Sequence, residues 1–179
     1  MALEDLLDSA NPGTSFADYG NEANYWKQAY SWEPKKKHQF IMEIDGIPAF
    51  LIKASAKPSI QNGEIGLDHI NVKRYVKGKS EWQAIAVTLY DPILPSATQA
   101  VMDWIRLHHE SVTGRNGYSS MYKKNITLNQ LSPLGEKIEQ WDLIGAYIVD
   151  SNFGDLDWGQ EEVMEITMNL RYDYAIFQF

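Results

Sequence analysis

The last third of the chain, Glu136 to Phe179, reads as two long strands of alternating residues joined by a single loop. In the second strand, apolar and aromatic side chains alternate with polar ones; the apolar set is Val163, Ile166, Met168, Leu170, Tyr172, Tyr174 and Ile176. A repeat of two residues predicts a strand with one buried face. A strand this apolar at a chain end needs a partner strand and cover, because open sheet edges promote association. The pattern favours a subunit of an assembly over an enzyme.

The net charge of −8 is concentrated in the same region. Residues 136–179 hold ten acidic residues against two basic ones, Lys137 and Arg171. Such an acidic surface disfavours tight binding of nucleic acid, whose phosphates need basic partners. The basic residues gather earlier, at Lys73, Arg74, Lys77 and Lys79. A basic segment and an acidic one on the same chain fit head-to-tail self-association, although two separately solvated surfaces explain the charges equally well.

Composition and turn signals divide the 179 residues into an N-terminal arm, 1–37, and one domain, 38–179. The arm is polar, and a short helix is predicted at Glu4–Ser9. It also carries six aromatic residues: Phe16, Tyr19, Tyr25, Trp26, Tyr30 and Trp32. A simple linker has few aromatic residues, so we expect the arm to pack on its own domain or on a neighbour.

The domain is predicted to be mainly β. Asp45-Gly46 lies between apolar runs and predicts a tight hairpin that joins Phe40–Ile44 to residues 49–52. One helix is predicted at about 96–113, because Ser96 and Gln99 form a capping box and Gly114 follows its end. Strands on both sides of a single helix give an antiparallel β-sandwich or barrel with one flanking α-helix.

No chemical motif supports an enzyme. The chain has no cysteine and carries no glycine-rich phosphate loop, nucleophile elbow or zinc-protease motif. His108 and His109 are neighbours on the predicted helix and point about 100° apart, so they cannot jointly bind a metal. Asp155 and Asp157 could hold a cation, but turn formation explains them better. We expect no catalytic, cofactor-binding or metal-binding residue and no cofactor.

The chain also contains no run near the roughly 18 apolar residues that a membrane helix needs. Its acidic N-terminus lacks the pattern of a signal peptide. We therefore expect a protein without a membrane segment, made in a cytoplasm.

Three stretches in a fixed order carry a resemblance to a known family. They are Trp141–Tyr147, Gly154–Trp158 and Leu170–Tyr174, supported upstream by Phe40–Ile44, Ala54–Pro58 and the helix around Trp104. Together, over residues 38–179, they resemble the tail tube proteins of contractile-tailed phages, a family related to the tube proteins of contractile injection systems. The resemblance implies a hexameric ring whose subunits pool their strands into one barrel that lines a lumen. Stacked rings then form a hollow tube inside a contractile sheath.

The same resemblance implies the partners of the chain. They are further copies of itself, the tail sheath protein, a tape-measure protein in the lumen, the baseplate, and phage DNA that passes through without specific binding. A negative lumen repels the phosphate backbone, so the genome would slide through it. The implied location is the tail of the virion, after assembly in the host cytoplasm, and the implied role is structural.

The charge asymmetry suggests how copies meet. We expect Ala54–Gly78 to form a protruding arm that inserts into neighbouring subunits, with Lys73, Arg74, Lys77 and Lys79 facing acids of the adjacent ring. An ordinary surface hairpin is the alternative. Other functions stay open: the tube of a bacterial contractile injection or type VI secretion system, a baseplate protein that initiates the tube, or, from a different class, a monomeric ligand-binding β-barrel.

Overall fold

The computed structural model describes residues 33–178, and its contacts divide the chain into two units, Met1–Lys37 and His38–Phe179. The predicted helix at Glu4–Ser9 and the six aromatic residues of the arm lie outside the described residues. The description below concerns the second unit.

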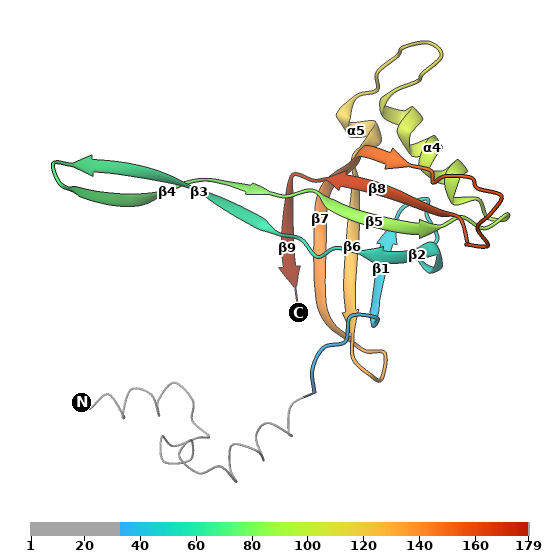
Figure 1. Cartoon of the computed structure of the whole chain (residues 1–179), viewed down its shortest axis with the longest axis horizontal. Coiled ribbons are helices and arrows are strands. Elements are labelled where there is room, and N and C mark those ends of the chain that lie inside the picture. Colours follow the sequence, from blue (N-terminus) through green and yellow to red (C-terminus); the bar gives the residue numbers. More distant parts are fainter. Residues whose placement is uncertain (1–32, 179) are drawn as a thin grey trace, which may run out of the picture. The chain divides into compact units, whose positions relative to one another are not determined.

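The second unit is built on one antiparallel sheet with the strand order β1-β6-β7-β8-β5-β2, and β9 also pairs with β7 (Figure 1). Its strands are β1 (Phe40–Ile44), β2 (Ile52–Ser55), β5 (Ile85–Tyr90), β6 (Lys124–Leu131), β7 (Lys137–Asn152), β8 (Glu165–Arg171) and β9 (Tyr174–Gln178). The sheet is folded into two layers, one with β1, β6 and β9 and one with β2, β5 and β8, and the long strand β7 belongs to both. Its first half lies between β6 and β9, and its second half pairs with β8. The mainly β class with antiparallel strands is confirmed.

The change of layer occurs at Gly145, which has a φ of 69°. Opposite this point, the last strand, which was predicted to continue without a break to the C-terminus, is divided in two. Its first part, β8, pairs with the second half of β7, while β9 pairs with the first half. Asp173 lies at the break, and its backbone N–H donates to the carbonyl of Ile144 over 3.0 Å. The prediction of one continuous last strand is therefore wrong, because β7 bends and its partner must bend with it.

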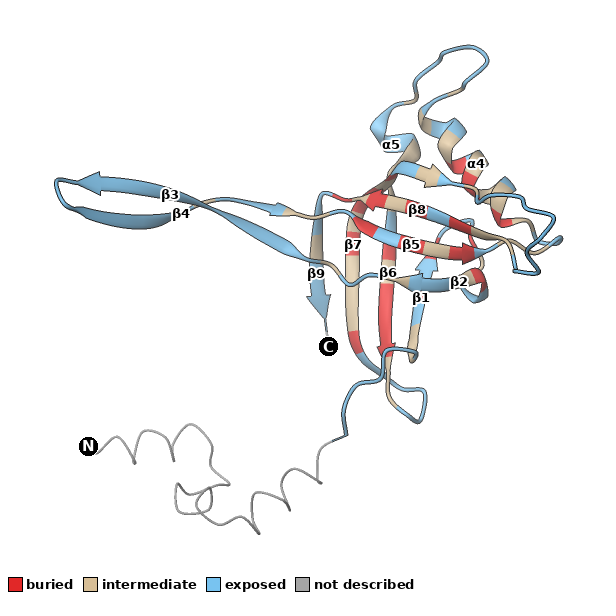
Figure 2. Cartoon of the chain, in the orientation of Figure 1, coloured by how far each residue is buried: buried red, intermediate tan, exposed pale blue. Residues whose placement is uncertain are grey.

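The alternating pattern places one face of each strand in a common core. The buried apolar residues include Met42, Ile44, Val87, Leu89, Ile126, Leu128, Leu143, Ile166, Met168 and Leu170 (Figure 2). They occupy every second position of β1, β5, β6 and β8, as a half-buried sheet requires. Leu51 joins them from the short helix η1 (Ala49–Leu51), and Trp104 from the main helix.

The predicted hairpin at Asp45-Gly46 is only partly right. Gly46 makes the turn with a φ of 83°, and Ile44 bridges to Ile47. However, β1 then pairs with β6, while residues 49–51 form η1 and β2 pairs with β5. The two segments belong to different layers, so the turn changes layers and does not close a hairpin.

The main helix, α4, spans Ala97–His108 and begins as predicted, because the side chain of Ser96 accepts a hydrogen bond from the N–H of Gln99. It ends at His108, before the predicted end near residue 113. His109 has an extended backbone conformation and forms an isolated β-bridge with Asn116. The N–H of Gly117 donates to the carbonyl of His108. Gly114, with a φ of 68°, therefore sits in the following turn. The short helix α5 (Ser119–Tyr122) leads into β6.

The first turn of α4 depends on the carboxylate of Asp91. Its Oδ1 accepts from the N–H of Ala97 at 2.9 Å, and its Oδ2 accepts from the hydroxyl of Thr98 at 2.6 Å. Burial alone would raise the pKa of Asp91, but the hydrogen bonds from Thr98 and Ala97 outweigh burial and hold the pKa below its ordinary value.

We expect Asp91→Ala to lower the free energy of unfolding by about 1–3 kcal/mol at neutral pH, because it removes a charged acceptor from a helix N-terminus. The native pKa lies below the unfolded pKa, so this contribution is present above about pH 4 and is lost as the pH falls through the native value. Urea unfolding of both proteins at pH 7 and at pH 3 measures this. A difference that does not shrink at the lower pH would contradict the role of the carboxylate.

Candidate assembly surfaces

A long two-stranded hairpin projects from the sheet. Its strands, β3 (Ile60–His69) and β4 (Val72–Trp82), pair only with each other (Figure 1). Nearly every residue in them is exposed (Figure 2). The predicted arm therefore exists, but it is shifted along the chain, since Ala54 belongs to β2 and the second strand runs to Trp82.

The two faces of this hairpin differ in chemistry. Residues directly opposite each other on antiparallel strands point to the same face. The pairs Ile65–Val76, Leu67–Arg74 and His69–Val72 make one face, which we name the apolar hairpin face. The pairs Glu64–Lys77, Gly66–Tyr75 and Asp68–Lys73 make the other, charged face. Exposed isoleucine, leucine and valine on an isolated hairpin indicate a surface that another protein covers.

This register separates the four cations that the sequence grouped. Lys73 lies 3.7 Å from Asp68, and Lys77 lies across from Glu64, so the charged face balances its own charges. Arg74 instead lies on the apolar hairpin face, where its cross-strand partner is Leu67. Lys79 lies beside the bulge where the register shifts between Asn62 and Glu64. The structure thus does not bring the four cations together. The alternation of side chains along a strand could have shown from the sequence that Lys73 and Arg74 point to opposite faces.

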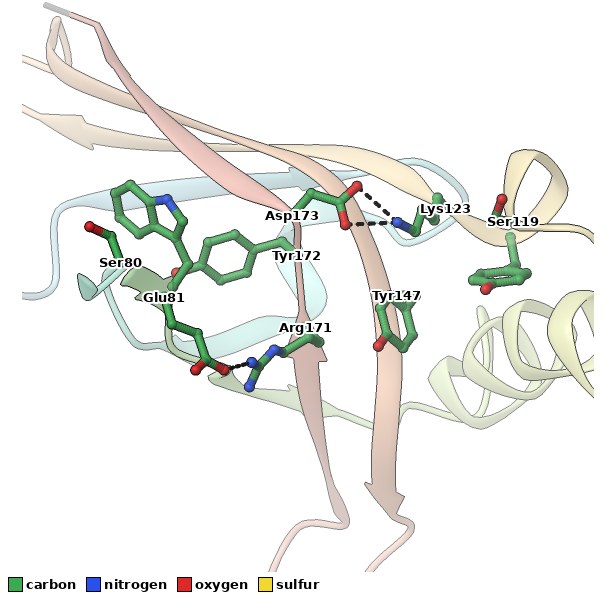
Figure 3. Close-up of a pocket in the computed structure, with 10 residues that line it drawn as sticks. Ser80, Glu81, Ser119, Lys123, Tyr147, Arg171, Tyr172 and Asp173 are labelled. Carbon is green, nitrogen blue, oxygen red and sulfur yellow. Dashed lines mark hydrogen bonds and ion pairs between the residues drawn. The ribbon is translucent and has the colours of Figure 1, made fainter. Parts of the chain in front are cut away.

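The base of the hairpin is fixed to the sheet. Glu81 of β4 forms an ion pair with Arg171 of β8, and the rings of Trp82 and Tyr172 lie 6.1 Å apart (Figure 3). Burial raises the pKa of the Tyr172 phenol above its ordinary value. These contacts border a hollow of about 450 Å³. They hold the hairpin in a defined direction, as a docking element requires.

The other wall of the hollow carries a second ion pair. Lys123, which follows α5, donates to both carboxylate oxygens of Asp173 at 2.7 and 2.8 Å (Figure 3). Asp173 lies at the bend between β8 and β9, so this pair ties the bend to the start of β6.

A second candidate surface is the outward face of β1, β6, β7 and β9, opposite the core. Its residues form two rows across the four strands: Glu43, Thr127, Asp142 and Ile176, and beside them Ile41, Asn129, Gln140 and Gln178. The carboxylate of Asp142 accepts hydrogen bonds from the side chains of Thr127 at 3.2 Å, Gln140 at 3.0 Å and Gln178 at 2.5 Å. Asn129 is fully buried in this face and Thr127, Gln140 and Asp142 are half-buried, so the members that meet water most directly are Ile41, Glu43, Ile176 and Gln178.

The residues that the sequence analysis considered and set aside as metal ligands have local roles. The ring of His108 packs on Tyr122, whereas His109 Nδ1 lies 3.0 Å from Asn116 Oδ1. Burial, with repulsion from His109, lowers the pKa of His108. The side chain of Asp157 accepts a hydrogen bond from the N–H of Gly159, which stabilises a turn. Within residues 33–178 no group of three histidine or carboxylate side chains is arranged to bind a metal, and none of the helices there is long and apolar enough to cross a membrane.

The fold is similar to that of chains from contractile injection systems. A chain from the cryo-EM structure of an extracellular contractile injection system, the PVC sheath/tube terminator in its extended state, is 18% identical with a TM-score of 0.69, over 83% of this chain and 99% of that chain. A chain of the PVC sheath–tube complex is also 18% identical, with a TM-score of 0.66 over 85% and 96%. One from the baseplate of the anti-feeding prophage is 16% identical, with a TM-score of 0.64 over 82% and 97%.

The sequence identifies the family. The model of the T4-like virus tail tube protein gp19 family matches residues 36–176, and the chain belongs to that family. The resemblance seen in the sequence is confirmed. No curated protein matches the sequence significantly.

Proposed function

We propose that this chain is the repeating subunit of a phage tail tube, in which six copies form a ring and rings stack into a hollow conduit. The family membership supports this role most directly. The structure adds a projecting hairpin, and within residues 33–178 the strands β1, β2 and β9 each have one edge without a partner strand, which neighbouring copies would pair. The proposed role is structural, without catalysis, and the family favours the tube over a monomeric ligand-binding β-barrel.

The lumen would be lined by the outward face of β1, β6, β7 and β9. Apart from the buried Asn129, its polar residues fit a water-filled wall, and the carboxylates of Glu43 and Asp142 would repel phosphate, so that DNA passes without binding. The sheath, the tape-measure protein in the lumen and the baseplate complete the proposed set of partners. The completed tube would lie in the virion tail after assembly in the host cytoplasm.

Electron microscopy of the purified full chain tests the proposal. We expect six-fold rings that grow into tubes as the concentration rises, because each ring presents the same surfaces to the next. A protein that stays monomeric at every concentration would overturn the proposed tube. The tube of an extracellular injection system is the second candidate, favoured by the solved chains of that class. Neighbouring genes for capsid and tape-measure proteins would separate the two.

The cations of the hairpin, Lys73, Arg74, Lys77 and Lys79, remain the proposed contact between rings. We expect Lys73→Glu with Arg74→Glu to prevent tube formation and leave a folded protein, because both side chains are exposed. The matched control reverses two exposed cations outside the hairpin, Arg115→Glu with Lys137→Glu, with the same change in net charge. Normal tubes from the hairpin variant, or equal loss in the control, would contradict this contact.

A further inference from the structure

Two exposed surfaces lie at opposite ends of the paired strands β5 and β8. At one end Ile85 pairs with Leu170, and the β3–β4 hairpin joins the sheet there through Trp82. At the other end Tyr90 pairs with Glu165, and two loops, residues 91–96 and 153–164, leave the sheet. Figure 1 shows the hairpin and these loops pointing away from each other. We name the two loops together the acidic tip.

The acidic tip is one surface with exposed apolar side chains. The N–H of Asp91 donates to the carbonyl of Met164 over 3.1 Å, which joins the two loops. Its exposed apolar residues are Ile93, Leu94, Leu156, Trp158 and Val163. A hollow of about 640 Å³ runs along the second loop, with Leu156 and Val163 in its wall. Trp158 follows Asp157 of the hollow's wall in the chain and is fully exposed, and an exposed tryptophan is a typical anchor for a protein partner.

The charge of the two loops is one-sided, although Lys53 of β2, which forms an ion pair with Glu165, also lines the hollow. Residues 153–164 contain four acidic residues, Asp155, Asp157, Glu161 and Glu162, and no basic one. In the part of the chain that the structure describes, none of the four takes part in an ion pair. A partner that covers the apolar residues must therefore supply positive charge, because carboxylates are costly to bury unpaired.

The apolar hairpin face meets both requirements. It presents Ile65, Leu67, Val72 and Val76, all exposed, around a single cation, Arg74. Arg74 has no ion pair within residues 33–178, whereas Lys73 on the charged face already lies against Asp68. A guanidinium on an apolar surface is suited to a carboxylate on a complementary apolar surface, since it makes directed hydrogen bonds and is weakly hydrated.

We propose that the apolar hairpin face of one copy docks on the acidic tip of a second copy, with Arg74 paired to carboxylates of residues 153–164 and the hairpin's apolar residues covering Leu156 and Trp158. Because the two surfaces lie at opposite ends of the same domain, the contact is head-to-tail and repeats from copy to copy. This inference rests on the proposed tube function and names the surface that receives the hairpin.

Cross-linking tests the contact directly, because the chain has no cysteine of its own. Two full-length variants, Val72→Cys and Trp158→Cys, are mixed and treated with a short bismaleimide. We expect a heterodimer band. The matched control pairs Val72→Cys with Leu134→Cys, an equally exposed residue in the β6–β7 loop, and should give little of it. Equal yields with both partners, or none with Trp158→Cys, would overturn the docking.

Charge reversal tests the same contact through assembly. We expect Arg74→Glu alone, and Asp155→Lys with Asp157→Lys alone, each to abolish tubes, and the three substitutions in one chain to restore them. Mixing the two defective proteins should also restore tubes, in which the variants alternate, since the reversed hairpin of one variant fits the reversed tip of the other and the two unaltered surfaces fit each other. Unchanged tubes from Arg74→Glu, or loss without rescue, would overturn the inference.

The two experiments also separate this inference from the function on which it rests. If the unaltered protein forms tubes but Val72→Cys does not cross-link to Trp158→Cys, the docking is wrong and the tube stands. If cross-links form while no ring or tube is ever seen, the contact stands and the tube proposal fails.

Discussion

Replacing Trp104 by alanine is expected to lower the free energy of unfolding by about 3–5 kcal/mol, a large part of the 5–15 kcal/mol typical of a domain. Trp104 in α4 is 1% exposed and is among the largest fully buried side chains. Its indole N–H donates to the carbonyl of Tyr122 over 2.7 Å, and the Nζ of Lys124 lies 4.9 Å from its ring centre. The substitution therefore leaves a cavity and an unpaired carbonyl between α4 and the start of β6.

Urea unfolding followed by far-UV circular dichroism measures this loss, because that signal comes mainly from the backbone and is little affected by the loss of one tryptophan. Trp104→Phe keeps most of the volume but loses the hydrogen bond, so a cost of about 1–2 kcal/mol is expected. Trp158→Ala removes an exposed tryptophan and should change stability by no more than about 0.5 kcal/mol. If Trp104→Ala and Trp158→Ala cost the same, the packing of α4 on the sheet is not as described.

Local patterns in the sequence were sufficient to predict individual strands and the start of the helix. The strand Phe40–Ile44 follows from alternation, and the start of α4 follows from Ser96. These features depend on neighbours a few residues apart in the chain. The end of α4 depended on a bridge between His109 and Asn116, a contact that helix periodicity does not report.

Pairing between distant segments could not be read from the same patterns. The turn at Asp45-Gly46 has the chemistry of a hairpin, yet its flanking segments pair with β6 and β5 and not with each other. Nothing local distinguishes a turn within a layer from a turn between layers. The break at Asp173 is equally nonlocal, since the bend that requires it lies in β7 at Gly145.

The candidate assembly surfaces were predictable only in part, because they also depend on the pairing of strands. Composition indicated a basic projecting segment and an acidic end of the chain. The strand register then assigned Arg74 to an apolar face and Lys73 to a face where Asp68 lies opposite. A one-residue change of register would exchange the two faces, so charge counts alone could not separate them.

Replacing Gly145 by alanine is expected to lower the free energy of unfolding by about 2–5 kcal/mol. A φ of 69° costs a residue with a side chain about 1–2 kcal/mol. A Cβ there would also lie 2.3 Å from Asp173 Oδ2, and Lys123 holds that carboxylate in place through both of its oxygens. Asp173 is exposed, so its carboxylate can relieve the overlap only by changing its rotamer and leaving Lys123, which adds about 1–3 kcal/mol. Urea unfolding gives the total.

Gly114→Ala separates the two causes, because Gly114 has nearly the same φ, 68°, and nothing within 4 Å of the position of its Cβ. It should therefore show only the backbone cost. If the extra loss at Gly145 comes from Asp173, Gly145→Ala should cost less in an Asp173→Ala background than in the unaltered chain, as coupled neighbours do. Equal costs in both backgrounds, or equal costs for the two glycines, would mean that the bend in β7 does not depend on the close approach of Asp173. The division of the last strand into β8 and β9 would then need another cause.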